Sequence, residues 1–282
     1  MPVDDARYQS FRRRMKRLTR DLSAEEQLEV VRAKVMDYLS RTGVTKTAAE
    51  DIRGFARTLM AREMEPFVDK AFERQFSAID SVNKLYADLG DDITRNFTAI
   101  YAIEQANAQQ FGDYEDDAAI KIQNAVRKAV TTGQSLDDLE KVIAGISEKT
   151  AFYAEAIAKT QVRVVSRVAK VEKARIAEVF YYQYVGNVRG VTRAFCRTMA
   201  GSTHHVDTIR QLRNGNKEPV LTNCGGWQCV HDWEPDPFAT AADEAELVTI
   251  PEGTRTVVLA GGEGTAAAYQ QNKRAAARAA SR

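Results

Sequence analysis

Hydrophobic residues recur every three to four positions from residue 4 to about residue 178, which is the period of amphipathic helices rather than of strands. Capping boxes at residues 23–26 and 47–50 mark two expected helix starts, and Ser135 followed by Asp138 marks a third. The pattern therefore predicts a long helical body before any other kind of structure begins.

Several residues predict interruptions of that helical body. Gly43 is expected to end one helix, and Pro66 should kink the next or mark the first turn of a new one. Breaks are also expected at residues 90–92 and 111–113. Three helices should follow the second break, at about residues 118–130, 136–146 and 149–180.

The pattern changes near Tyr181, where β-forming residues alternate with turn-forming glycine and asparagine up to residue 190. A short helix is expected within residues 203–214, and a β-hairpin over 246–259 with its turn at 251–253. The last residues, 261–282, form either a flexible tail or a helix that orders on a partner.

The expected fold class is mainly α, with a small α+β module near the C-terminus. The expected boundaries are a helical N-terminal region over residues 1–134, the α+β module with its lead-in helices over 135–260, and a flexible tail rich in Ala, Gly and Arg over 261–282. A chain of 282 residues suits roughly two domains.

Composition narrows the class of protein further. The balance of 40 Lys and Arg against 39 Asp and Glu gives a net charge of +1, so any contact with nucleic acid must be local. No apolar run approaches the ~20 residues that span a bilayer, and the N-terminus lacks the pattern of a secretory signal. Three cysteines are an odd number, which favours a reducing compartment over a disulfide framework.

The first predicted helix is strongly basic on one side and apolar on the other. Its apolar residues are spaced as one helix face: Tyr8, Phe11, Met15 and Leu18. Its candidate nucleic-acid contacts are Arg12, Arg13, Arg14, Lys16 and Arg17. The helix is therefore either an arm that docks by its apolar face and contacts DNA by its charges, or a basic face exposed to solvent. We expect no membrane contact, because the chain offers no second anchor.

All three cysteines and all three histidines lie between residues 196 and 231. Thiolate and imidazole are the usual ligands of structural zinc, which prefers four of them in a tetrahedron. The candidate metal ligands are Cys196, Cys224, Cys229 and His231, and zinc is the candidate cofactor. The alternative is that these residues are small buried cysteines and ordinary polar histidines.

Two elements in this region carry a family resemblance. An R-x-F-C element covers residues 193–196, and a G-G-x-x-C-x-H-x-W element covers residues 225–233. Together with Gly201 between them, they resemble the C-terminal module of the phage head-morphogenesis, or Mu F-like, family of minor head proteins. The similarity covers roughly residues 135–235. Cys196, Cys229 and His231 match the family pattern, whereas Cys224, His204 and His205 lie outside it.

The resemblance implies a non-catalytic minor capsid protein of a tailed bacteriophage that acts in head assembly and DNA packaging. The implied location is the virion, either the head interior or the portal vertex, with the host cytoplasm as the place of assembly. The implied partners are the portal protein, the major capsid protein or both, with packaged DNA as a further contact, and several copies are expected in one assembly.

Two other functions stay open. The first is a nuclease seated in the Cys/His-rich module, in which an imidazole would work beside Arg193, Arg197 or Arg210. The second is a cellular zinc-dependent adaptor. The chain has no phosphate-binding loop or hydrolase motif. We expect the carboxylate pairs at residues 91–92, 116–117 and 137–138 to stabilise helix starts.

Overall fold

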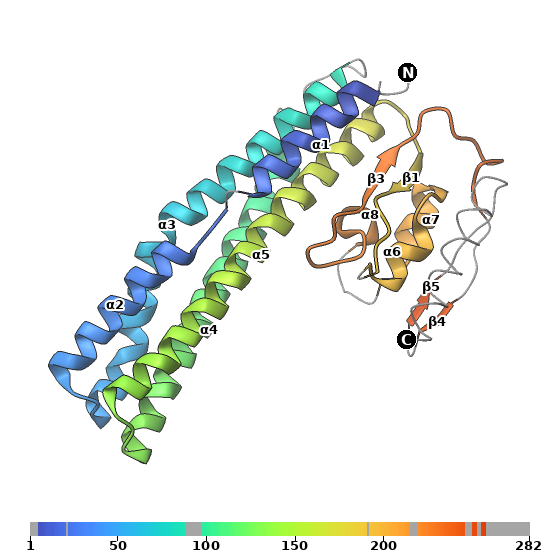
Figure 1. Ribbon diagram of the computed structural model, residues 1–282. Coiled ribbons are helices and arrows are strands. Elements are labelled where there is room, and N and C mark those ends of the chain that lie inside the picture. The colour runs from blue at the N-terminus through green and yellow to red at the C-terminus, as the bar shows by residue number, and fades with distance from the viewer. Residues whose placement is uncertain are drawn as a thin grey trace. The chain divides into compact units, whose positions relative to one another are not determined.

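The computed structural model describes residues 5–20, 22–87, 97–190, 192–214, 219–245, 250–252 and 255–257 (Figure 1). The protein is mainly helical, with a small three-stranded sheet in its C-terminal region. This confirms the expected fold class. The expected tail over residues 261–282 and the expected break at 90–92 lie outside the described residues.

Long helices fill the described chain up to Ile176. They are α1 (Asp5–Arg20), α2 (Glu25–Thr42), α3 (Lys46–Leu85), α4 (Phe97–Thr132) and α5 (Leu136–Ile176). The apolar stripe of α2 is buried as its spacing predicts, and Gly43 ends that helix with a φ of 71°. No helix among the described residues is both long enough and apolar enough to cross a membrane.

Two expected breaks are wrong, because helices continue through them, and Pro66 does not begin a new helix. The kink expected at Pro66 stays a prediction. α3 runs through Pro66, α4 runs through Gly112, and α5 has no break between residues 146 and 149. Phe67 and Phe111 are both buried and meet edge to face, with ring centroids 6.1 Å apart. Such packing beside Pro66 and beside Gly112 offsets the cost of about 3 kcal/mol for proline and about 1 kcal/mol for glycine inside a helix.

Helix starts follow the sequence in one case and shift in two. Ser135 Oγ accepts a hydrogen bond from the Asp138 backbone at 3.1 Å, which confirms Ser135 as the N-cap of α5. α2 begins without a side-chain cap, whereas Thr45 rather than Thr47 caps α3. Helix starts chosen from sequence are thus uncertain by one or two residues.

The carboxylate pairs also differ from one another. Asp137 and Asp138 do lie in the first turn of α5. Asp116 and Asp117 lie inside α4 instead, so the helix dipole does not explain them. Asp116 forms an ion pair with Arg53 of α3 at 3.0 Å, which makes it a contact between helices. The pair at 91–92 lies outside the part of the chain that the structure describes.

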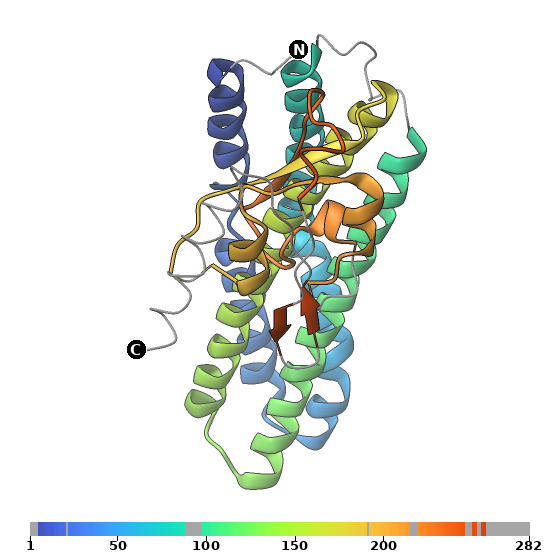
Figure 2. The same ribbon diagram turned by 90° about the vertical axis from the view of Figure 1, so that its right-hand side faces the viewer.

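Contacts divide the chain into two compact units, each built from separate segments. The helical unit comprises residues 16–77 and 96–162. In it α2, α4 and the corresponding parts of α3 and α5 lie side by side (Figures 1 and 2). Gln123 of α4 donates to the Ala49 carbonyl at 3.1 Å, and Lys34 of α2 pairs with Glu63 of α3 at 2.8 Å.

The mixed unit comprises residues 1–15, 78–95 and 163–282. Its sheet has the order β2-β1-β3 and is antiparallel throughout. The strands are β1 (Tyr181–Val185), β2 (Thr203–His205) and β3 (Asp232–Pro235). The short helices are α6 (Ala194–Met199), α7 (Val206–Gln211) and α8 (Val220–Asn223). β1 and α7 confirm the strand expected near Tyr181 and the short helix expected within 203–214.

The expected hairpin is present in part. β4 (Ile250–Glu252) pairs antiparallel with β5 (Arg255–Val257), and Ile250 lies opposite Val257. Pro251 and Glu252 belong to the strand rather than to the turn where we expected them. The outer parts of the hairpin lie outside the described residues.

The core of the mixed unit surrounds the central strand. Tyr182 and Tyr184 are two residues apart on β1, and both are buried with Trp233 of β3. Cys196, Cys224 and Cys229 belong to the same core cluster. The domain boundaries expected at residues 134 and 260 stay predictions. They state which segments would fold independently, and the contacts in the structure do not test independent folding.

Candidate metal centre

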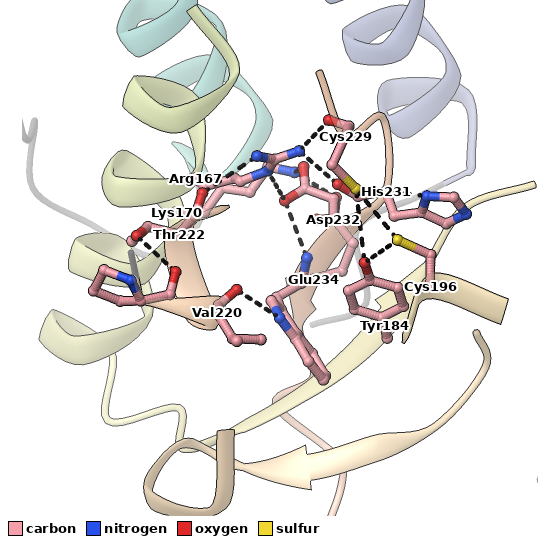
Figure 3. Close-up of polar contacts among 12 residues, drawn as sticks. Arg167, Lys170, Tyr184, Cys196, Val220, Thr222, Cys229, His231, Asp232 and Glu234 are labelled. Carbon is pink, nitrogen blue, oxygen red and sulfur yellow. Dashed lines mark hydrogen bonds and ion pairs between the residues drawn. The ribbon is translucent and has the colours of Figure 1, made fainter. Parts of the chain in front are cut away.

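Two segments far apart in the sequence bring three candidate ligands together. Cys196 lies in α6, whereas Cys229 and His231 lie between α8 and β3 (Figure 3). The sulfurs of Cys196 and Cys229 are 3.6 Å apart, and Cys229 Sγ lies 3.7 Å from His231 Nδ1. All three side chains are buried, and their ligand atoms lie within 4.8 Å of one another. This group could hold a metal ion.

Glycine makes this close approach possible at two positions. A Cβ added to Gly225 would lie closer than 3.0 Å to Cys196 Sγ and 3.1 Å from Cys229 Sγ. A Cβ added to Gly186 would lie closer than 3.0 Å to the His231 ring. Residues around the site therefore leave no room for a side chain at either position.

Arg167 holds the loop that carries two of the ligands. Its guanidinium comes from α5, is buried, and donates to the backbone carbonyls of Cys229 and His231, each at 2.7 Å. It also donates to the Thr222 carbonyl at 3.3 Å. Since the hydrogen bonds to Cys229 and His231 are buried, losing the guanidinium would leave their two carbonyls without these donors.

A buried ion network follows directly after His231. Lys170 of α5 has no exposed side-chain surface and contacts both Asp232, at 2.5 Å, and Glu234. Tyr86 donates to Glu234 at 2.7 Å, and the Lys170 ammonium lies 4.6 Å from the centre of the Phe11 ring. This network fixes the strand that begins next to the ligand.

The two paired thiols differ in acidity. Hydrogen bonds that the Cys229 sulfur accepts from the Cys196 thiol and from His231 hold the pKa of Cys229 well below its ordinary value. The bond between the two thiols, with burial, raises the pKa of Cys196 far above its ordinary value. Cys229 therefore loses its proton more readily than Cys196, and a cation that binds both sulfurs as thiolates would displace the proton of the Cys196 thiol as well.

The donor set fits a tetrahedral ion of the zinc type. Zinc–sulfur and zinc–nitrogen bonds of about 2.3 and 2.0–2.1 Å imply a sulfur–sulfur distance of about 3.8 Å and a sulfur–nitrogen distance of about 3.6 Å. The observed 3.6 and 3.7 Å are close to both. Nε2 of His231 is also buried without a hydrogen-bond partner among the described residues, whereas Nδ1 faces the Cys229 sulfur.

The other cysteine and histidines stay outside this group. Cys224 is buried, but its sulfur does not join the three grouped ligand atoms. His204 lies on β2 with Nε2 3.0 Å from Ser202 Oγ, and burial lowers its pKa to about 4. His205 caps α7 by accepting a hydrogen bond from the Asp207 backbone at 3.3 Å. Their roles are structural in this arrangement.

The candidate nucleic-acid residues lie on α1, mostly on its exposed side. Arg12, Arg13, Lys16 and Arg17 are exposed, whereas Phe11 and Leu18 are buried. Arg14 differs from the others because it pairs with Asp80 at 2.8 Å. Among the described residues, no carboxylate forms an ion pair with Arg13, Lys16 or Arg17.

Sequence reasoning missed three residues of the site. Arg167 and Lys170 are three positions apart on one face of α5. Buried apolar residues such as Val162, Ala169 and Ala174 also lie on this helix, and charged residues among apolar ones are a signal for buried partners. Tyr184 contacts the ligands, and its only signal was its place in the alternation of β1.

Compared with known proteins, the chain matches no protein-family model, no curated protein and no solved structure.

Proposed function

We propose that this chain is a non-catalytic minor head protein of a tailed bacteriophage, acting in head assembly near the portal vertex or the inner capsid wall. One observation supports it most. The R-x-F-C and G-G-x-x-C-x-H-x-W elements, which carry the family resemblance, converge on one buried group formed by Cys196, Cys229 and His231. Cys224, His204 and His205, which lie outside the family pattern, are not part of that group.

The proposed cofactor is a structural zinc ion. Cys196, Cys229 and His231 would hold it, and zinc would supply a fixed tetrahedral link between α6 and β3. Burial of these side chains favours a structural role over a catalytic one, because substrate has no access to a closed site. The module is small, so a metal would offset a limited hydrophobic core.

The metal part of the proposal is tested by elemental analysis of the purified full chain, with Cys196→Ser and Cys229→Ser as variants. One zinc per chain is expected in the wild type, with loss of zinc and a lower melting temperature in each variant. Wild-type protein purified without chelators that contains no zinc contradicts this part alone.

The assembly part is tested by coexpression with the portal protein encoded by a neighbouring gene. Co-elution with portal rings and detection in mature heads by mass spectrometry are expected. A chain absent from both heads and portal rings, or encoded far from portal and large terminase genes, contradicts it and favours a cellular adaptor.

The exposed side of α1 supports contact with packaged DNA. A helix that buries Phe11 and Leu18 while exposing Arg13, Lys16 and Arg17 presents a line of positive charge. Replacing these three with Gln should weaken DNA binding and lower its dependence on salt concentration, by about one unit of slope per lost phosphate contact. Replacing Arg127 and Lys128, exposed on α4, is the matched control.

The nuclease alternative receives little support from the geometry. His204 and His231 are buried, and His205 caps a helix. A nuclease assay on the wild type and on His231→Ala separates the two functions. Cleavage that depends on His231 would replace the structural proposal with the enzymatic one.

A further inference from the structure

One side chain contacts all three candidate ligands of the metal centre. Tyr184 Oη donates a hydrogen bond to Cys196 Sγ at 3.3 Å and lies 3.8 Å from Cys229 Sγ. Its ring is stacked on the imidazole of His231, with centroids 5.6 Å apart and an angle of 5° between the planes. Figure 3 shows the hydroxyl pointing at both sulfurs.

The position of Tyr184 is fixed by the protein around it. Its backbone forms two hydrogen bonds of 2.8 Å, to the Ser202 carbonyl and from the Gly201 amide. Its buried ring meets Trp233 and Phe195 edge to face, with centroids 4.7 and 6.0 Å away. The hydroxyl is therefore already aimed at the sulfurs before any ion binds.

Charge balance favours a neutral hydroxyl beside the ion rather than a coordinated phenolate. A divalent cation with two thiolates and a neutral imidazole carries no net charge. A phenolate would add a negative charge to a buried site, which is costly unless a cation is free to balance it. Arg167, the cation that holds the ligand loop, is already paired with Asp232 at 3.4 Å.

We propose that Tyr184 is the positioning residue of this metal centre: its hydroxyl hydrogen bonds to the thiolates, its ring fixes the imidazole, and it raises metal affinity without binding the ion itself. The inference rests on the proposed zinc centre. Groups that hydrogen bond to metal ligands fix their orientation, and losing one lowers metal affinity by about 10- to 100-fold.

The test compares Tyr184→Phe with Tyr182→Phe in the full chain. Tyr182 is the matched control because it lies two residues away on the same strand and is equally buried. Its register partner on β2 is His204, which is not a candidate ligand. Competition with a coloured chelator measures zinc affinity. Tyr184→Phe should bind zinc about tenfold or more weakly, whereas Tyr182→Phe should bind it like the wild type.

Two spectra distinguish positioning from a general packing effect. In cobalt-substituted protein, Tyr184→Phe should shift the thiolate-to-cobalt charge-transfer band to lower energy, because the lost hydrogen bond had stabilised the sulfur electrons. The bands typical of tetrahedral cobalt should persist. In the wild type, the ultraviolet difference spectrum on zinc binding should contain no tyrosinate band, and this measurement needs no variant.

The outcomes separate this inference from the proposed function. A wild type that binds no zinc overturns both. A wild type that binds zinc, with unchanged affinity and an unshifted cobalt band in Tyr184→Phe, overturns the inference alone. A tyrosinate band overturns it too, because Tyr184 would then be a ligand. Equal losses of affinity in Tyr184→Phe and Tyr182→Phe would show a packing effect and would also overturn it.

Discussion

The helical unit and the mixed unit are stabilised in different ways. In the helical unit, stability comes from many similar apolar contacts, and helices continue through Pro66 and Gly112 because their neighbours pack well. In the mixed unit, single residues have roles that no neighbour can take over. Gly225 leaves the space that two sulfurs occupy, and Arg167 and Lys170 each pair with acceptors from distant segments. Proline and glycine inside helices are therefore tolerated in the helical unit, whereas conservative substitutions should strongly lower the stability of the mixed unit.

The largest contrast between the units should come from glycine-to-alanine changes. Gly225→Ala should cost about 3 kcal/mol and abolish metal binding, because the new Cβ would displace the sulfur of Cys196. Gly112→Ala in α4 meets nothing within 4 Å and should stabilise the helical unit by about 0.5–1 kcal/mol. Urea unfolding measures the stability of the two variants, and zinc titration measures their metal binding. Similar effects of the two substitutions would contradict the difference between the units.

Buried and exposed lysines give the next largest difference. Lys170→Met should cost roughly 3 kcal/mol, because Asp232 and Glu234 would remain buried without their cation. Lys121→Met removes an exposed ion pair with Asp117 in α4 and should cost less than about 0.5 kcal/mol. Both are read from urea unfolding at neutral pH. Equal losses would mean that the buried network does not determine the stability of the mixed unit.

Acid should weaken the mixed unit through His204. Because burial lowers the pKa of His204 from 6.5 to about 4, the unfolded chain takes up a proton in this window and the folded chain does not. The free energy of unfolding should therefore fall by about 3 kcal/mol as the pH drops from 6.5 to about 4. His204→Gln should lack most of this loss, measured by urea unfolding with a chelator present in every sample. An unchanged pH dependence in the variant would contradict the assignment.

The smallest effect is expected at the cysteine outside the metal centre. Cys224→Ala removes one buried sulfur and should cost about 1 kcal/mol. Zinc content and affinity should stay at the wild-type level, because Cys224 is not among the grouped ligand atoms. A loss of zinc as large as that of Cys229→Ser would make Cys224 the fourth ligand.

Features that depend on neighbouring residues were predictable from the sequence, and features that depend on distant contacts were not. The Ser135 capping box acts over three residues, so its sequence signal survives in the fold. Pro66 lies inside α3 and not at the start of a new helix, and the neighbouring Phe67 packs on Phe111, which is 44 positions away (111 − 67). Local signals thus indicated the helices and the end of α2 at Gly43, but not that α4 and α5 continue through the expected breaks.

The candidate site shows the same division. Cys196, Cys229 and His231 were predicted because few residue types can bind zinc, so their identity alone is informative. Cys224 was grouped with them by closeness in sequence, which does not determine where a sulfur lies. The roles of Arg167 and Tyr184 could not be predicted, because arginine and tyrosine have many structural roles in proteins. Only the fold brings these two residues to the ligands.

Gly225 also bears on how this chain can change over generations. Because two sulfurs occupy the space where any side chain would begin, a descendant that gains even a methyl group there must first lose or move one of its thiols. Homologues that keep both cysteines are therefore expected to keep glycine at this position, and homologues that lack it should have lost the paired sulfurs as well.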